Sequence, residues 1–450
     1  MNSRPDLIAY ALNESEKMVM QDQGTPQTES ASHDKPAPAP DKKSFLAQRL
    51  VSLDVYRGLI MITLAFNGFG LAATARIHLK KDSDSAVWVT VLHHSDHVEW
   101  TGCGYWDLIQ PSFMFMVGVA MAFSYAKRRE QGATYPRMFA HAVWRSLVLI
   151  FLGIFLISNG RQSTNWSLMN VLTQIGLGYT FLFLLWDRPL RVQWLCAAAI
   201  LIGVWLLYVL WPGTGIDLAT GKNSEGIQVV TKEWAQKNLP GIDPAWHKNA
   251  NAGHFIDREV LNWLPQQKTF QYDNGGYQTI NFLPSLATML FGLMCGELLR
   301  SNRGGGFKLA ILLLAGIVGL TAGYLLDHAG ICPIIKRIWT PSWALFSTGW
   351  CCLILAVLFA VVDVLKLRFW TFPFVVVGVN SIAIYCMGML LKKWTEHFLQ
   401  THLGSGVFPE VTEWLGLDAA FRPMVQLTMI GLVFWLICLW MYRQKIFIRI

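Results

Sequence analysis

Charged residues are scarce in this sequence. Lys, Arg, Asp and Glu make up 15% of its 450 residues, whereas a soluble protein of this size carries roughly 25%. The charges that are present gather in short runs between long apolar segments, and 53% of all residues are hydrophobic. An ordinary soluble domain is therefore excluded, and the composition predicts an all-α polytopic membrane protein.

No secretory signal opens the chain. Residues 1–48 include TPQTESASHDKPAPAPDKK, which is rich in Pro, Ala, Ser and charge and has too few large apolar residues for a core. We expect a disordered tail over 1–48 and a membrane domain over 49–450. The net charge of +8 is attributed to cytoplasmic loops rather than to nucleic-acid binding, because Lys and Arg gather on that face of membrane proteins.

A cysteine framework is missing as well. Six of the eight cysteines lie in apolar segments, where cysteine behaves as a small hydrophobic residue. Cys103 and Cys332 fall in loops on the same predicted side of the membrane, and the sequence leaves open whether they pair.

Apolar windows of about 20 residues, the length that crosses a bilayer core, predict a bundle of about ten transmembrane helices. The candidate spans are 56–75, 107–126, 143–159, 168–186, 193–211, 281–299, 308–326, 343–363, 373–391 and 423–442. Short basic loops fall on one face, which we assign to the cytoplasm together with both termini. These loops are KRRE at 127–130, DRPLR at 187–191, RSNRGGGFK at 300–308 and LKLR at 365–368. Lys80–Lys81, Lys336–Arg337 and Lys392–Lys393 depart from the rule.

The opposite face carries the long connections, 76–106, 212–280, 327–342 and 392–422. The extracytoplasmic loop 212–280 is polar, and we expect it to fold over the membrane domain. Loops of that length are usually functional rather than simple connectors.

Residues 93–111, HHSDHVEWTGCGYWDLIQP, place three histidines and three acids at the outer mouth of the second span. Such groups at a membrane boundary are costly and usually functional. One interpretation is a metal site, because His93 and His97 are four residues apart, although no H-E-x-x-H pattern follows. A second is structural, with the acids solvating a loop and Trp88, Trp100, Tyr105 and Trp106 forming an interfacial belt.

The third interpretation is catalysis. A neutral imidazole can take a proton from an attacking amine or hydroxyl near pH 7. Asp107 either orients His97 or caps the second span, and Asn67 in ITLAFNGFG is costly in lipid unless it faces the interior. Its amide is suited to polarising a thioester carbonyl. Spacing alone does not choose among the three interpretations.

Several motifs, in order over about 350 residues, resemble the transmembrane heparan-α-glucosaminide N-acetyltransferase family, which has bacterial members. These are S-x-D-x-x-R-G at Ser52, Asp54, Arg57 and Gly58; Asn67 followed by glycines; H-x2-W-x-G-x4-D-L-x2-P from His97 through Asp107 to Pro111; IDR at 256–258; YQTIN at 277–281, where Gln278 replaces the family's glycine; and G-x-N-S at Gly378, Asn380 and Ser381.

The resemblance implies ten core spans and acetylation of a terminal glucosamine on the far side of the membrane by cytoplasmic acetyl-CoA. His97 takes the place of the family's active histidine and Asn67 that of its nearby asparagine, with Asp107 as the third catalytic candidate. Acetyl-CoA is expected as co-substrate rather than as a resident cofactor, and no metal is expected.

Further candidates follow from the same motifs. Asp54, Arg57, Asn380 and Ser381, with the KRR run at 127–129, are assigned to acetyl-CoA, and Asp257, Arg258 and Asn281 to the acceptor. Several of them have a structural alternative: Arg57 pairs with Asp54, Asp257 and Arg258 belong to an ordinary salt bridge that organises their loop, and the two asparagines bond between helices.

The competing function is a proton-coupled transporter of a small polar solute, with His97 and Asp107 as a relay. The sequence shows no strong internal repeat of the kind that such transporters often carry. The expected partners are acetyl-CoA, an extracytoplasmic amino sugar or glycan and the lipid bilayer, with a possible homodimer and no nucleic acid. The expected location is a bacterial inner membrane.

Overall fold

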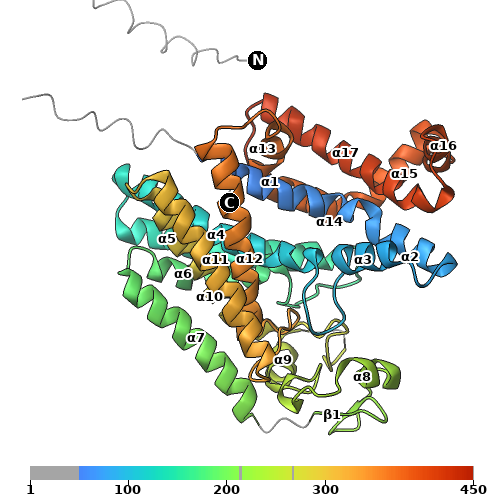
Figure 1. Ribbon diagram of the computed structural model, residues 1–450, viewed down its shortest axis with the longest axis horizontal. Helices are drawn as coiled ribbons and strands as arrows, with labels where there is room; N and C mark the ends of the chain where they lie inside the picture. Colours follow the sequence, from blue (N-terminus) through green and yellow to red (C-terminus); the bar gives the residue numbers. More distant parts are fainter. Residues whose placement is uncertain (1–49, 212–214, 266–267, 449–450) are drawn as a thin grey trace, which may run out of the picture. The chain divides into compact units, whose positions relative to one another are not determined.

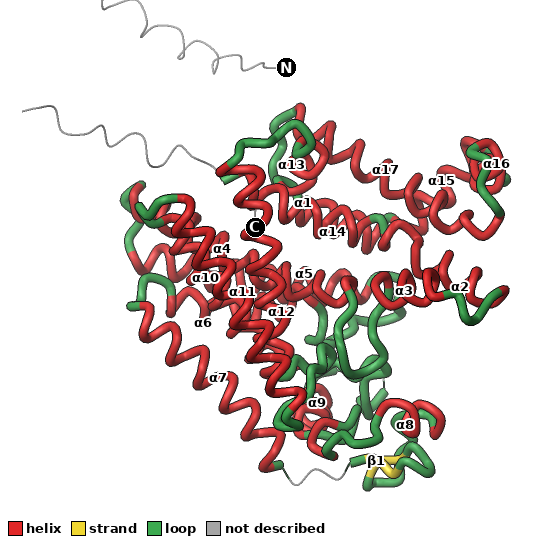
Figure 2. Tube along the Cα trace, viewed as in Figure 1, coloured by secondary structure: helices red, strands yellow, loops and turns green. Residues whose placement is uncertain are grey.

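The computed structural model describes residues 50–211, 215–265 and 268–448, and regular structure in these ranges is overwhelmingly helical (Figures 1 and 2). The chain divides between Gln48 and Arg49 into two units, and every described residue belongs to the second. The tail predicted over 1–48 lies outside the described residues.

Within those described ranges, seven helical segments are long and apolar enough to cross a bilayer. They are Tyr105–Glu130 (a 3-10 turn followed by α4, Ile109–Glu130), α5 (Tyr135–Ser158), α7 (Leu190–Leu210), Thr279–Arg300 (containing α10, Phe282–Arg300), α11 (Gly305–His328), Pro341–Val364 (containing α12, Pro341–Leu358) and Ala419–Arg443 (containing α17, Arg422–Arg443). Two bent pairs and the shorter α6 (Val171–Leu185) complete a set that overlaps all ten predicted spans. The all-α polytopic class is confirmed.

The first bent pair corrects the predicted span 56–75. α1 runs from Val51 to Ala65 and is followed by Asn67–Lys81, which contains α2 (Leu71–Lys81), at an angle of 48°. Asn67 therefore lies just beyond a helix end rather than in the middle of a span. The second bent pair joins α13 (Phe372–Gly378) to α14 (Ser381–Leu390) at 78°.

The turn after α1 has a left-handed backbone. Asn67, Gly68, Phe69 and Gly70 have φ angles of 50°, 61°, 54° and 73°. Glycine adopts this region without cost and asparagine tolerates it better than most residues. A Cβ on Gly70 would also lie 2.5 Å from the carbonyl oxygen of Pro423 at the start of α17. Both constraints favour NGFG at this point and fix the direction in which Asn67 leaves α1.

Small residues let the central helices approach closely. A Cβ on Gly118 of α4 would lie 1.8 Å from the carbonyl oxygen of Met289 of α10, and one on Gly292 would lie 2.1 Å from that of Phe115. Across α1 and α13, a Cβ on Gly58 would lie 1.9 Å from the carbonyl oxygen of Phe374. Close backbone contact at small residues is the usual way in which membrane helices associate.

The predicted loop 212–280 forms a small lobe at one end of the bundle, which we call the loop lobe (described residues 215–265 and 268–278). It contains β1 (Ile216–Asp217) paired antiparallel with β2 (Lys222–Asn223), α8 (Lys232–Asn238) and α9 (Ala252–Asn262). Trp246 stacks on Tyr208 at the end of α7 with ring centroids 5.3 Å apart. The lobe therefore packs on the membrane helices, as expected.

We call this end of the bundle the outer end. It also carries α2, α3 (Ala86–Ser95), α15 (Lys392–Leu403) and α16 (Val407–Trp414), which gather on one side of Figure 1. The opposite end, where α4 finishes in Lys127, Arg128 and Arg129, is called the basic end.

Candidate active site

His97 lies in the extended segment between α3 and the 3-10 turn Tyr105–Leu108. The carboxylate of Asp96 accepts the His97 backbone N–H at 2.8 Å and also pairs with Arg76 of α2. These contacts fix the backbone at His97 against the helical hairpin formed by α2 and α3. The imidazole is 35% exposed, so it is both held in place and open to a ligand.

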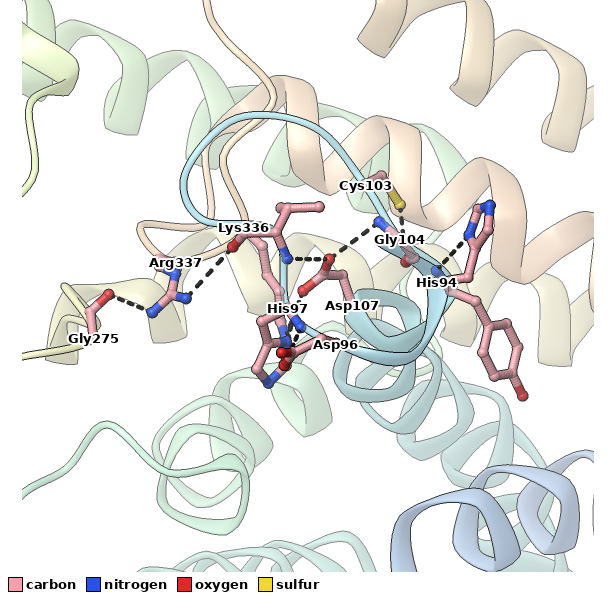
Figure 3. Close-up of polar contacts among 11 residues, drawn as sticks. His94, Asp96, His97, Cys103, Gly104, Asp107, Gly275, Lys336 and Arg337 are labelled. Atoms are coloured by element: carbon pink, nitrogen blue, oxygen red, sulfur yellow. Dashed lines mark hydrogen bonds and ion pairs between the residues drawn. The ribbon is translucent and has the colours of Figure 1, made fainter. Parts of the chain in front are cut away.

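Asp107 bonds both to His97 and to the backbone of the turn before α4. Its Oδ2 accepts the backbone N–H groups of Gly104 at 3.1 Å and Val98 at 3.2 Å, which organises the turn before α4. Its Oδ1 lies 2.8 Å from Nδ1 of His97 (Figure 3). The side chain of Asp107 is only 1% exposed. The carboxylate is therefore fixed in the fold and orients the imidazole.

Lys336 is the member of the site that sequence reasoning missed. Its Nζ lies 2.9 Å from Nδ1 of His97 and 3.2 Å from Oδ1 of Asp107 (Figure 3). An antiparallel bridge between Thr101 and Ile335 places the 329–340 connection beside the His97 segment. The signal in the sequence was the Lys336–Arg337 pair, a departure from the positive-inside pattern.

Electrostatics keep the imidazole uncharged. Burial lowers the pKa of His97, the hydrogen bond to Asp107 opposes this shift, and the nearby Lys336 charge adds to it. Burial also lowers the pKa of Lys336, to about 8, against the raising effect of Asp107. Near neutral pH His97 is therefore a neutral base. Since Nδ1 faces Asp107 and Lys336, Nε2 is the nitrogen left for chemistry.

His97 and Lys336 open into a cavity of about 640 Å³, which we call the outer cavity. Asn67 lines the same cavity, so the structure brings together the catalytic asparagine and histidine candidates. The other polar lining residues are Gln110, Asn159, Tyr277, Tyr385, Lys392 and Lys393. Aromatic and aliphatic side chains from α1, α4 and α14 make up most of the remaining wall.

A second cavity, of about 800 Å³, lies at the basic end and is called the basic cavity. Four cations line it: Arg57, Lys127, Arg128 and Arg145. Asp54 and Ser381 line it too, and Arg57 lies 3.8 Å from Asp54. The two interpretations of Arg57, as ion-pair partner and as cavity residue, are therefore both compatible with the structure.

Asn380 shapes this cavity without lining it. Its amide donates to the carbonyl of Ile446 and accepts the N–H of Ile448, both at 3.1 Å. Those two bonds hold residues 446–448, of which Phe447 and Ile448 line the basic cavity.

The three acceptor candidates lie outside both cavities. Asp257 is buried and accepts the N–H of Thr279 at 3.1 and 3.0 Å, and burial raises its pKa to about 7. Arg258 pairs with Glu225, and the Asn281 amide donates to the carbonyl of Arg337 at 2.8 Å. These contacts connect parts of the loop lobe and the outer end, and a role in binding the acceptor stays a prediction.

Three alternatives considered from the sequence do not match the described part of the structure. α3 ends at Ser95, so His93 and His97 do not share a helical face, and the described part of the chain holds no cluster of three potential metal ligands. Cys103 and Cys332 are both free thiols rather than a disulfide. Trp100 is buried, with its indole N–H donating to the carbonyl of Trp246 at 3.1 Å, and so does not belong to an interfacial belt.

No model of a known protein family matches the chain. Human heparan-α-glucosaminide N-acetyltransferase is 24% identical over 422 residues, covering 84% of this chain and 58% of the human protein. The mouse protein of the same name is 22% identical over 405 residues, covering 79% of this chain and 55% of the mouse protein. The chain thus spans little more than half the length of these relatives.

The fold and the two cavities define a multi-pass membrane protein with an ionisable centre at one end of its bundle. Within that class, the two matches support a family-level relationship with the heparan-α-glucosaminide N-acetyltransferases.

Proposed function

We propose that this protein transfers an acetyl group from acetyl-CoA, bound in the basic cavity, to the amine of a sugar in the outer cavity. The observation that carries the proposal is the placement of the two cavities. α1, α4 and α14 line both of them, with the cations at one end and the His97 centre at the other. The names of the related proteins support the same chemistry.

The distance between the cavities suits a thin, extended molecule. On α4 the outer cavity reaches Phe113 and the basic cavity begins at Ala120. Seven residues of α-helix correspond to about 10 Å. The pantetheine arm of CoA is narrow and extended, and can span this separation when its phosphates are held among the cations. The arm would then present the thioester near Asn67 and His97.

The basic cavity supplies what the nucleotide end of CoA requires. Arg and Lys side chains bind phosphate through charge-assisted hydrogen bonds, and four of them converge here against one lining carboxylate. The positive-inside pattern puts this end in the cytoplasm, where acetyl-CoA is made. We therefore place both termini in the cytoplasm and the protein in a bacterial inner membrane.

The chemistry at the outer cavity begins with proton removal by His97. Nε2 of His97 takes a proton from the acceptor amine while the amine nitrogen attacks the thioester carbonyl carbon. The Asn67 amide donates to the developing oxyanion, an interaction typically worth about 3 kcal/mol. When the tetrahedral intermediate collapses, the carbon–sulfur bond breaks and Nε2–H returns the proton to the CoA thiolate. The amide product and free CoA thiol account for every atom.

The lining charges point to an acceptor that carries an anionic group beside its amine. Lys336, Lys392 and Lys393 line the outer cavity, and no Asp or Glu is among its described lining residues. A carboxylate or sulfate on the sugar or on its neighbour would be attracted to these lysines. A hydroxyl acceptor is chemically possible with the same base.

The test uses protein reconstituted in liposomes, with acetyl-CoA labelled on its acetyl group outside and amino sugars inside. We expect label on an amino sugar, most on one that is linked to an acidic residue. Label on the protein in the absence of acceptor would show an acetyl-histidine intermediate instead of direct transfer. Uptake of a sugar without acetyl-CoA consumption would contradict the proposal and establish the transporter alternative.

A second prediction concerns acetyl-CoA binding. The double variant Lys127→Gln, Arg128→Gln is expected to raise KM for acetyl-CoA by about 10- to 100-fold, because each lost phosphate contact weakens binding by about 1.4 kcal/mol or less at an exposed site. We expect kcat to change little, and the difference from wild type to shrink at 1 M salt.

The matched control for that variant is Arg129→Gln. Arg129 is the next residue of α4 but pairs with Asp187 and does not line the basic cavity. Equal effects of the control and the double variant on KM would show that only the general charge of this end matters, and would contradict a phosphate site at Lys127 and Arg128.

A further inference from the structure

A buried cation beside a catalytic histidine needs a reason. Lys336 is 3% exposed, and removing an ammonium group from water is expensive unless it is paired and hydrogen-bonded. The carboxylate of Asp107 offers that pairing at 3.2 Å, but the ammonium lies even closer to Nδ1 of His97, at 2.9 Å. A simple counter-ion for Asp107 would not have to contact the imidazole.

The backbone around Lys336 holds it in this position. Gly102 donates its N–H to the carbonyl of Ile334 at 3.0 Å, next to the bridge between Thr101 and Ile335. Arg337 donates to the carbonyl of Gly275 at 2.8 Å and lies over the ring of Tyr277. The segment is therefore fixed between the His97 loop and the loop lobe, as Figure 3 shows for Lys336, Arg337 and Gly275.

The contacts at Nδ1 restrict the proton positions. Nδ1 either carries a proton and donates it to Asp107 at 2.8 Å, or is unprotonated and accepts from Lys336. In the first arrangement the ammonium donates to Asp107 Oδ1, and Nε2 of His97, a residue that lines the outer cavity, keeps its lone pair. A doubly protonated imidazolium would place a positive charge directly against the Lys336 ammonium, which disfavours that state.

Arg337 also disfavours a charged imidazole, but Lys336 is the cation in hydrogen-bond contact with the ring. Arg337, on the same connection, adds positive charge and engages the carbonyl oxygens of Gly275 and Val98. Asp96, beside His97 in sequence, is paired with Arg76. From α15, Lys392 and Lys393 line the outer cavity. Asp107 favours a charged imidazole, so Lys336 is the contacting group that opposes it.

We propose that Lys336 is a positioning residue that keeps Asp107 ionised and His97 uncharged, so that Nε2 offers a lone pair to the acceptor amine. The inference rests on the proposed acetyl transfer and adds a fourth residue to the centre formed by His97, Asn67 and Asp107. A structural lysine would hold the fold equally well at every pH, whereas this role predicts a change in the pH dependence.

The sign of that change follows from the charges. Activity requires neutral His97 and falls as the pH drops through its pKa. Removing the Lys336 charge takes away a group that disfavours imidazolium and leaves Asp107, which favours it. The pKa of His97 then rises, and the acidic limb of kcat/KM moves to higher pH. A charge in direct contact shifts a pKa by about 1 unit or more.

The experiment compares wild type, Lys336→Gln and Lys336→Arg in liposomes with the same acceptor. Lys336→Gln keeps a hydrogen-bond donor but loses the charge, and is expected to shift the acidic limb upward by about 1 pH unit; Lys336→Met is the second uncharged variant. Lys336→Arg keeps the charge and is expected to leave the limb in place. Lys237→Met, in an exposed lysine of the loop lobe that pairs with Glu99, is the control.

A second readout needs no acetyl transfer. Diethyl pyrocarbonate reacts with imidazole only in its uncharged form. The rate of modification at His97 against pH, followed by peptide mass spectrometry, therefore reports the protonation of that residue. An upward shift in Lys336→Gln supports the proposal even if wild type transfers no acetyl group, in which case only the proposed function fails. An unshifted midpoint, with uniformly lower activity at every pH, would overturn the role assigned to Lys336.

Discussion

His97→Gln is expected to lower acetyl transfer by about 10²- to 10⁴-fold while leaving acetyl-CoA binding nearly unchanged. The range is the usual contribution of a positioned general base. Glutamine is a hydrogen-bonding side chain and can occupy the space of the 35% exposed imidazole, but its amide cannot take up the amine proton. The basic cavity lies at the other end of α4 and contains no part of this centre. The measurement is kcat for acetyl transfer, with labelled acetyl-CoA binding measured in parallel.

His93→Gln is the matched control for this prediction. His93 is exposed, lies four residues earlier in the same sequence cluster, and contacts the ring of His94 rather than Asp107 or Lys336. It should retain nearly full activity. A comparable loss in both variants would mean that the cluster acts through its general charge or solvation. Retained activity in His97→Gln would remove His97 from the chemistry altogether.

The helical class and the positions of the spans were predictable from the sequence because hydropathy reports directly on the solvent around a helix. The bend after α1 was not found, since NGFG is apolar enough to pass as a continuation of the span. Its glycines and asparagine were the available signal, because they tolerate the left-handed backbone that the structure has there.

The candidate site was predictable in part. Motifs place Asn67 and His97 in the same region, and the charge pattern places that region at the end opposite the basic loops. Lys336 lies 239 residues from His97 in sequence, and spacing cannot reveal a contact made by packing of distant loops. The departure of Lys336 from the positive-inside pattern was visible in the sequence. The sequence alone does not distinguish a functional departure from an incidental one.

Asp257, Arg258 and Asn281 differ from Lys336, because the sequence singled them out and the structure places them outside both cavities. Their residue types and motif suggested sugar recognition, but in the structure their contacts are with Thr279, Glu225 and Arg337. A polar residue in an outer loop serves equally well for binding a ligand or for fixing the loop. Only the position of the cavity distinguishes the two, and that position depends on how the loop lobe packs on α7 and α10.

The second large effect is expected from Gly118→Leu in α4. A Cβ at this position would lie 1.8 Å from the carbonyl oxygen of Met289, which is backbone and cannot move aside alone. α4 and α10 must then separate, at a cost of at least about 3 kcal/mol of unfolding free energy. The measurement is the unfolding midpoint in mixed detergent micelles, together with the yield of monodisperse protein.

Gly203→Leu in α7 is the control, because a Cβ on Gly203 meets no atom within 4 Å. There the replacement of glycine in a helix should be neutral or stabilising by up to about 1 kcal/mol, so the two substitutions are expected to differ in sign. α4 lines both cavities, and it begins two residues after Asp107. Displacing α4 from α10 therefore disturbs the path between the cavities as well as the fold, and any Gly118→Leu protein that inserts should transfer acetyl groups poorly. Normal stability with normal transfer in that variant would mean that the close contact between α4 and α10 is not required for the arrangement on which the proposed function depends.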